Sequence, residues 1–337
     1  MFGGMKLFKK NLALCIALVL LLSGCGEAKQ NVEKNENNNQ EIISHDKQKI
    51  DSDNKQEITS NNKQEIASDD KSTTNNTTNK KLTELSKSTP ATTLKSFTPL
   101  VLSDTSSLST KAIGWSWLYS SRDSADLLSK YKGYGFGDTS QKIIYLTFDE
   151  GYENGYTSSI LDTLKANNVQ AAFFVTKPFV TGSFNGVPDT DLLKRISNEG
   201  HIIGNHSVQH KSMATFTSET DFNAEITGVE DAVNSVPGCK MSKYFRPPEG
   251  TFSEMSLYYT QKLGYKSIFF ALAYQDYNVD NQPDPEYSKA ALLKNTRDGM
   301  ICLLHAVSKT NATILDSLIK EWKNRGYEFK TLDDLPN

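Results

Sequence analysis

Aromatic residues are missing from a long early part of the chain: between Gly26 and Ser96 there is no Phe, Tyr or Trp. Asn, Lys, Gln, Ser, Thr, Asp and Glu dominate this stretch. Such a composition cannot bury enough apolar surface to offset the conformational entropy that is lost on folding. We therefore predict that residues 25–98 form a disordered polar tether that precedes the folded part of the protein.

The tether contains an eight-residue repeat, which covers residues 39–70 and reads NQEIISHD, KQKIDSDN, KQEITSNN and KQEIASDD. A coiled coil would need apolar residues at two positions of every heptad, and this repeat has too few. The repeat therefore indicates a linker. A flexible chain of this length has an r.m.s. span on the order of 45 Å, which suits a domain that works at a distance from a membrane anchor.

The chain also lacks an apolar run long enough to cross a bilayer comfortably, since that takes about 20 residues. The run from Leu12 to Leu22 follows three lysines, Lys6, Lys9 and Lys10, and ends in Leu-Ser-Gly-Cys25. This pattern is typical of a signal peptide, and the residues before Cys25 resemble a bacterial lipobox. We predict cleavage after residue 24 and an extracytoplasmic protein that lipidated Cys25 anchors to the cell membrane. An ordinary secretory signal or a short anchor helix is the alternative.

Basic tracts and cysteines are scarce in the rest of the chain. The formal net charge of −3 becomes more negative when the three lysines of residues 1–24 are removed, so we expect no nucleic-acid partner. Only Cys239 and Cys302 lie beyond Cys25, and one pair is no disulfide framework. Two buried thiols are the default interpretation, and a single bridge stays open because the compartment permits one.

Residues 99–337 alternate between β-rich runs and helical patterns, which predicts one α/β domain with a parallel sheet. The predicted strands are Ile143–Phe148, Ala171–Val175, Ile202–Asn205, a strand that begins at Tyr244–Phe245, Ser267–Leu272, Met300–His305 and Glu328–Thr331. The predicted helices are Thr157–Ala166, Asp189–Asn198, Thr217–Asn234, Ser253–Leu263, Glu286–Asn295 and Asn311–Asn324. About seven such units favour a distorted, incomplete (β/α) barrel.

Polar residues follow five of these strands at the point where each gives way to its loop. They are Asp149 with Glu150, His206 with His210, Arg246, Asp276, and His305. In a β/α barrel this rim carries the chemistry. Two histidines four residues apart lie on one face of a helix and are also a recurrent way of holding zinc. Their place on a rim with acids and a guanidinium favours a metal site.

The motifs TFDEG, HSVQH, RPPEG and LLH occur in this order and resemble those of the polysaccharide deacetylase family, also called the NodB-homology enzymes or carbohydrate esterase family 4. The resemblance extends from about Gly114 to Leu335. The stretches TFDEGYENGYT, YQDYNVDNQP and LLHAVSKTNA are most similar to the muramic-acid deacetylases that initiate muramic δ-lactam formation in the spore cortex.

The resemblance implies metal-assisted hydrolysis of an acetamide in peptidoglycan. His206, His210 and Glu150 would hold one divalent ion, with Zn²⁺ first and Mn²⁺ or Co²⁺ as alternatives. Asp149 would be the general base and His305 the general acid, and Arg246 would hold Asp149 in place. The expected partners are peptidoglycan glycan strands, and the domain is expected to be a monomer.

Two positions depart from the family pattern. Much of the family has a second aspartate where this chain has Glu150, so the third metal ligand stays open. Many relatives carry D-x-x-D-W near the fifth strand, where only Asp276 matches here, so Asp276 could pair with either His305 or Arg246.

The candidate substrate-binding residues are Tyr152, Pro248 and Tyr277. The alternatives are a peptidoglycan N-acetylglucosamine deacetylase, a non-catalytic wall-binding lipoprotein on the same fold, and a glycosidase. Adjacent carboxylates on a strand end point apart, whereas a glycosidase needs two carboxylates that flank one bond, so the glycosidase is disfavoured.

Overall fold

The computed structural model describes residues 97–116 and 122–336. The predicted signal peptide, the lipidated Cys25 and all of the predicted tether except residues 97 and 98 lie outside these ranges. Within them no helix combines the length and the apolar character that a membrane span requires. The domain described below is the part of the chain that carries the candidate active site.

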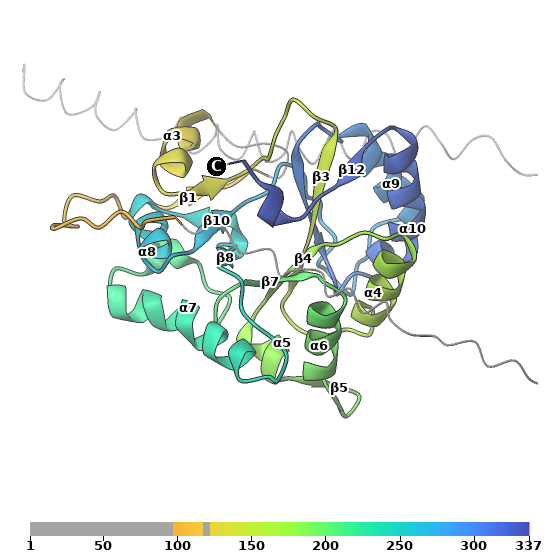
Figure 1. Cartoon of the computed structure of the whole chain (residues 1–337), viewed down its shortest axis with the longest axis horizontal. Helices are drawn as coiled ribbons and strands as arrows, with labels where there is room; N and C mark the ends of the chain where they lie inside the picture. Colours follow the sequence, from red (N-terminus) through yellow and green to blue (C-terminus); the bar gives the residue numbers. More distant parts are fainter. Residues whose placement is uncertain (1–96, 117–121, 337) are drawn as a thin grey trace, which may run out of the picture. The chain divides into compact units, whose positions relative to one another are not determined.

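A curved parallel sheet forms the centre of the domain (Figure 1). Its strands follow the order β11 (Met300–His305), β3 (Ile143–Glu150), β4 (Ala172–Val175), β7 (Ile202–Asn205), β8 (Tyr244–Phe245), β10 (Lys266–Ile268) and β2 (Gly133–Tyr134), and β12 (Glu328–Phe329) also pairs with β3. Each pairing within this sheet is parallel. The predicted α/β class and incomplete barrel are therefore confirmed.

Regular strand pairing is interrupted on the side of the barrel between β10 and β11. The predicted strand Ser267–Leu272 is too long, because β10 ends at Ile268. Beyond it the chain meets β11 through two backbone hydrogen bonds, from Ala271 N to Ile301 O at 2.8 Å and from Leu303 N to Leu272 O at 2.9 Å. On the same side, an isolated bridge pairs Phe136 with Met300, and Gly137 N donates to Gly299 O at 2.7 Å.

Helices surround the sheet (Figure 1). They are α3 (Arg122–Lys130), α4 (Thr157–Ala166), α5 (Lys177–Thr181), α6 (Thr190–Asn198), α7 (Glu219–Asn234), α8 (Glu254–Lys262), α9 (Pro285–Lys294) and α10 (Lys309–Asn324). The six predicted helices are present within two residues at each end, and α3 and α5 were not predicted. Short antiparallel pairs join β1 (Ile113–Gly114) to β9 (Thr251–Phe252) and β5 (Ser183–Phe184) to β6 (Val187–Pro188).

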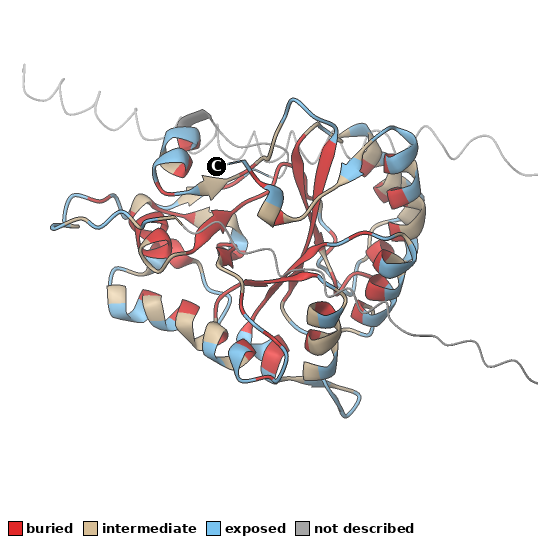
Figure 2. Cartoon of the chain, viewed as in Figure 1, coloured by how far each residue is buried: buried red, intermediate tan, exposed pale blue. Residues whose placement is uncertain are grey.

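Side chains on the two faces of the sheet belong to different cores. Ile143 and Tyr145 of β3 belong to a small inner cluster, whereas Ile144, Leu146 and Phe148 belong to the large cluster beneath the helices. Figure 2 shows the strands and the sheet-facing sides of the helices as buried. This alternation decides which polar residues at the end of β3 can reach the rim.

The two cysteines of the domain, Cys239 and Cys302, are buried and free. The default interpretation of two buried thiols is the one that the structure shows.

Candidate active site

Arg246 organises the inner rim of the barrel. It follows β8, is buried, and donates from Nη1 to Asp149 Oδ1 at 2.7 Å and from Nη2 to Thr147 Oγ1 at 2.8 Å. Its guanidinium also lies over the Phe174 ring, 4.2 Å from the ring centroid. The predicted contact between Arg246 and Asp149 is therefore present, and the guanidinium plane is held from several sides.

Asp149 stays ionised in this environment. Burial acts to raise the pKa of Asp149, but the positive charge of Arg246 outweighs burial and lowers the pKa below its ordinary value. One carboxylate oxygen accepts from Arg246, and the other, Oδ2, lies 3.3 Å from His206 Nε2. A buried carboxylate that keeps its charge can serve as a proton acceptor.

His206 presents a lone pair to that carboxylate. Its Nδ1 lies 2.9 Å from the backbone oxygen of Arg246, which can only accept, so Nδ1 carries the proton and Nε2 is the acceptor. Burial lowers the pKa of His206 to about 4, so the ring is neutral near pH 7. Nε2 and Asp149 Oδ2 are thus two acceptors that face each other at 3.3 Å. A cation next to both atoms would relieve their repulsion.

His210 lies beside His206, although residues 206–210 form a loop and not a helix. The two rings are 4.7 Å apart between centroids and inclined by 75°. The φ angle of His210 is +52° and that of Ser207 is +69°, conformations that non-glycine residues adopt infrequently. These two backbone conformations turn the His210 ring toward the His206 ring. The rings therefore approach through a bend in the loop, and not because they share one face of a helix, as the sequence spacing suggested.

Glu150 does not join the histidine pair. It follows Asp149 on β3, so its side chain lies on the opposite face of the strand, where Oε1 accepts from Thr157 Oγ1 of α4 at 3.0 Å. Burial and the nearby carboxylate of Glu153 raise the pKa of Glu150 well above its ordinary value. The expectation that Glu150 is the third ligand disagrees with this geometry.

Within residues 97–116 and 122–336, no group of three or more His, Cys, Asp or Glu side chains is arranged as a ready metal cage. The chemistry of the donors nevertheless fits a divalent ion held by His206 and His210 with the Asp149 carboxylate beside it. The fit rests on the unprotonated Nε2 that faces a carboxylate oxygen.

His305 and Asp276 form a second charged pair on the rim. His305 Nδ1 lies 2.7 Å from Asp276 Oδ1, and the backbone N–H of His305 donates to Oδ2 at 2.9 Å. Burial acts to lower the pKa of His305, but the Asp276 charge and hydrogen bond outweigh it and raise the pKa. Asp276 therefore pairs with His305 and not with Arg246, and the imidazole keeps its proton to higher pH.

The three candidate substrate-binding residues differ in accessibility. Tyr277 is 46 % exposed and its ring lies 5.6 Å from the His305 ring, and Tyr152 is 50 % exposed in the loop after β3. Pro248, in the short 3₁₀ turn Pro248–Gly250, is buried and offers little surface to a substrate. Exposed tyrosines next to the rim can stack on sugar rings, so the structure leaves these two as the better candidates.

Sequence reasoning missed two residues that support the charged pairs. Thr147 accepts from Arg246, and Asn311 of α10 donates from Nδ2 to Asp276 Oδ2 at 2.5 Å and to His305 O at 3.0 Å. A threonine inside an apolar strand, two residues before Asp149, was a readable signal of an inward-facing polar site. Asn311 gave no such signal, because it reaches Asp276 from 35 residues away.

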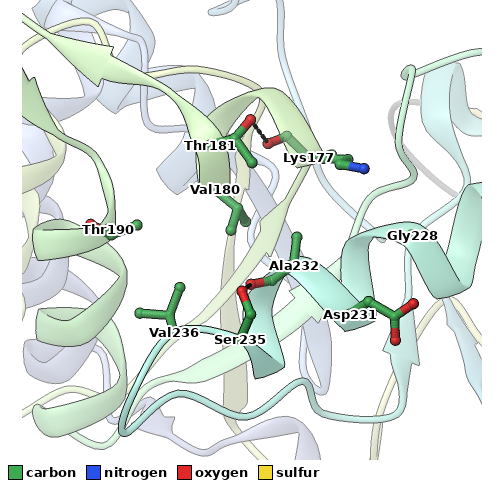
Figure 3. A pocket seen from close by; sticks show the side chains of 9 residues that line it. All are labelled: Lys177, Val180, Thr181, Thr190, Gly228, Asp231, Ala232, Ser235 and Val236. Carbon is green, nitrogen blue, oxygen red and sulfur yellow. Dashed lines mark hydrogen bonds between the residues drawn. The ribbon is translucent and has the colours of Figure 1, made fainter.

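One surface hollow of the described domain lies away from the rim. Its volume is about 530 Å³, and α5, α6 and α7 line it with Lys177, Val180, Thr181, Thr190, Gly228, Asp231, Ala232, Ser235 and Val236 (Figure 3). A second hollow is lined by Phe136, Thr139, Thr296, Arg297, Asp298 and Tyr327. Neither of these two hollows is lined by a charged rim residue.

Comparisons with known proteins agree with the geometry. The sequence profile described as polysaccharide deacetylase matches residues 136–268. The peptidoglycan-N-acetylmuramic acid deacetylase PdaA of Bacillus subtilis is 43 % identical over 209 residues, which cover 62 % of this chain and 77 % of that protein. The peptidoglycan-N-acetylglucosamine deacetylase PgdA of Listeria monocytogenes is 32 % identical over 200 residues, 58 % of this chain and 39 % of that protein.

The solved structure of Bacillus subtilis PdaA, described as a family 4 carbohydrate esterase, superimposes with a TM-score of 0.63 at 39 % identity and covers 68 % of this chain and 98 % of that one. The chain thus matches the polysaccharide deacetylase profile and shares the fold of the Bacillus subtilis protein. It belongs to the polysaccharide deacetylase family, carbohydrate esterase family 4, and is a hydrolase that acts on amide bonds.

Proposed function

We propose that this enzyme removes the acetyl group of N-acetylmuramic acid in peptidoglycan, as the step that leads to muramic δ-lactam in the spore cortex. The observation that carries the chemistry is the pairing of Asp149 with His305 on neighbouring parallel strands, each held by an oppositely charged partner. A base and an acid thus stand side by side at one rim. The choice of sugar rests on the similarity to PdaA.

Asp149 acts as the general base. It accepts a proton from the attacking water through the carboxylate that Arg246 keeps ionised and oriented. The water oxygen adds to the acetyl carbonyl carbon, and the carbonyl π electrons move to its oxygen. A divalent ion held by His206 and His210 would supply Lewis acidity at this position.

His305 acts as the general acid. Its Nδ1 is bound to Asp276, so Nε2 is the nitrogen left to donate a proton to the departing amide nitrogen. The C–N bond then breaks, its electron pair stays on nitrogen, and the products are acetate and a free amino sugar. Asp276 stabilises the protonated imidazole and so raises the fraction of enzyme that is ready to donate.

The setting of the reaction is proposed from the sequence. Lipidated Cys25 would anchor the enzyme to the cell membrane, and the tether would carry the domain into the wall or cortex, where the glycan strands lie. Zn²⁺ is the proposed ion, with Mn²⁺ or Co²⁺ as alternatives, because imidazole ligands suit all three.

Mass spectrometry of muropeptides tests this function. Peptidoglycan treated with the enzyme should lose one acetyl group per modified muramic residue, and the Asp149→Asn variant provides the inactive control. Loss of acetyl groups from glucosamine alone would favour the alternative, a peptidoglycan N-acetylglucosamine deacetylase. The similarity to PgdA of Listeria monocytogenes supports that alternative. Binding to peptidoglycan with no loss of acetyl would indicate a non-catalytic wall-binding protein.

A further inference from the structure

We propose that Glu225 and Gly228 of α7 are positioning residues for metal binding, because they fix the shape of the histidine loop, defined as residues 206–210. The inference rests on the proposed metal role of His206 and His210. Glu225 is buried on α7, which packs against β7, α5 and α8 (Figure 1). It belongs to none of the sequence motifs that mark the family.

Glu225 holds the middle of the loop by two hydrogen bonds. The Val208 N–H donates to the backbone oxygen of Glu225 at 3.0 Å, and the Gln209 N–H donates to its carboxylate Oε2 at 2.9 Å. The loop therefore docks onto one residue of α7 through two consecutive peptide groups. The carboxylate supplies one of these acceptors, so it is the part that a substitution can remove.

The other N–H groups of the loop donate to the end of the neighbouring strand β4, to Asn205 at the end of β7, and within the loop itself. His206 N donates to Val175 O, Ser207 N to Asn205 Oδ1, and His210 N to Ser207 Oγ, at 2.9, 3.0 and 3.0 Å respectively. Each backbone donor from residue 206 to residue 210 thus has an acceptor. Two features tie this set to α7: the contacts to Glu225, and a bond from Asn205 Nδ2 to Ile226 O at 2.8 Å. Of these, the contacts to Glu225 are the ones made directly by the loop.

Gly228 makes room for the loop. A Cβ atom added there would lie 2.8 Å from Val208 Cγ2, closer than side-chain atoms normally approach. Gly228 lies inside a helix of 16 residues, where glycine has a lower helix propensity than alanine. Its φ is in the ordinary helical range, so close packing of Val208 is the structural reason for its lack of a side chain.

The loop depends on these contacts because its own conformation is strained. Ser207 and His210 both have positive φ angles, which cost free energy unless the surroundings impose them. His210 is exposed, and its ring packs against the ring of His206. The position of the second imidazole is therefore set by the backbone of the loop and, through it, by α7.

Zinc titration of the metal-free protein with a competing chelator tests the inference. Glu225→Ala should weaken zinc affinity about 10- to 100-fold, the range for outer residues that orient metal ligands. Glu225→Gln should stay within a few-fold of the unchanged protein, because an amide oxygen still accepts from Gln209. Glu219→Ala provides the matched control on the same helix, since Glu219 binds Lys262 and not the loop.

A double-mutant cycle separates the Gly228 contact from a general effect on α7. Gly228→Ala should weaken zinc affinity by at least 10-fold without lowering the melting temperature, because alanine favours the helix. Val208→Ala removes the methyl group that clashes, so the double variant should bind zinc as tightly as Val208→Ala alone. Equal losses in both backgrounds would overturn the role of the Gly228 contact.

Hydrogen exchange in the metal-free protein makes the inference independent of zinc. The peptide that contains Val208 and Gln209 should exchange faster in Glu225→Ala than in Glu225→Gln. The unchanged protein could bind no zinc while Glu225→Ala still exchanges faster than Glu225→Gln. In that case the metal role of His206 and His210 is wrong, but Glu225 still holds the histidine loop in place. If Glu225→Ala matches the unchanged protein in both exchange and zinc affinity, the inference is overturned.

Discussion

Nε2 of His206 and Oδ2 of Asp149 face each other at 3.3 Å in the interior of the rim, one as an imidazole lone pair and the other as a carboxylate. The backbone oxygen of Arg246 accepts a hydrogen bond from the Nδ1–H of His206, while the Arg246 side chain donates to the other oxygen of Asp149. One arginine thus fixes both the tautomer of the histidine and the orientation of the base. This coupling connects the metal site and the base, and four of the predictions below depend on it or on the neighbouring His305–Asp276 pair.

Asp149→Asn should abolish turnover while zinc binding persists. The amide keeps the shape of the carboxylate and can still accept from Arg246, but it cannot take the proton of the attacking water. We expect a rate loss of about 10²- to 10⁴-fold or more, typical of one acid–base group. Acetate release and zinc titration on the same sample measure the two effects, and loss of zinc without loss of rate would reverse the assignment.

Asp276→Asn should move the alkaline limb of the pH–rate profile to lower pH. Asp276 raises the pKa of His305, so the imidazole donor stays protonated to higher pH when the carboxylate is present. Removing the charge lowers that pKa, and the active, protonated form is lost earlier as the pH rises. The measurement is kcat/KM against pH for both proteins, and coincident alkaline limbs would contradict the assignment of His305 as the acid.

Glu150→Gln should retain the bound metal, whereas His206→Ala or His210→Ala should lose it. Glu150 lies on the helix-facing side of β3 and binds Thr157, away from the two imidazoles. Elemental analysis of the purified variants, after dialysis against a low zinc concentration, separates the outcomes. A Glu150→Gln protein without metal would restore Glu150 to the ligand set.

Arg246→Leu should destabilise the fold by about 3–5 kcal/mol, because it leaves the buried Asp149 carboxylate without its counter-charge. Arg195→Ala is the matched control. Arg195 pairs with two carboxylates, Asp162 and Glu199, but it is partly exposed, so we expect a loss of about 1 kcal/mol or less. Urea unfolding measures both, and equal losses would show that burial of the Arg246 pair contributes nothing extra.

The order of strands and helices was readable from the sequence because each run had the right length and periodicity, and the rim followed from the position of polar residues at strand ends. Glu150 shows where that reasoning stopped short. Alternation along a strand separates Glu150 from Asp149, and the same alternation that disfavoured a glycosidase also argues against Glu150 as a ligand beside His206.

Other parts of the site depend on contacts between distant residues, which no local pattern reports. Asp276 pairs with His305 because the segment after β10 leaves the regular sheet and runs beside β11. The sequence did not show this, because β10 is shorter than its apolar run suggested. The support from Asn311 and Glu225 likewise comes from helices whose rotation about their axes the sequence does not specify.

The central claim is that the charged rim hydrolyses an acetamide of peptidoglycan with the help of a metal held by His206 and His210. Acetate release from polymeric peptidoglycan by metal-free enzyme, before and after the addition of one equivalent of Zn²⁺, tests it most directly. The account predicts little acetate before the addition and restored release after it, with no restoration in His206→Ala. Full release by the metal-free enzyme, unchanged by Zn²⁺ or by His206→Ala, would contradict it.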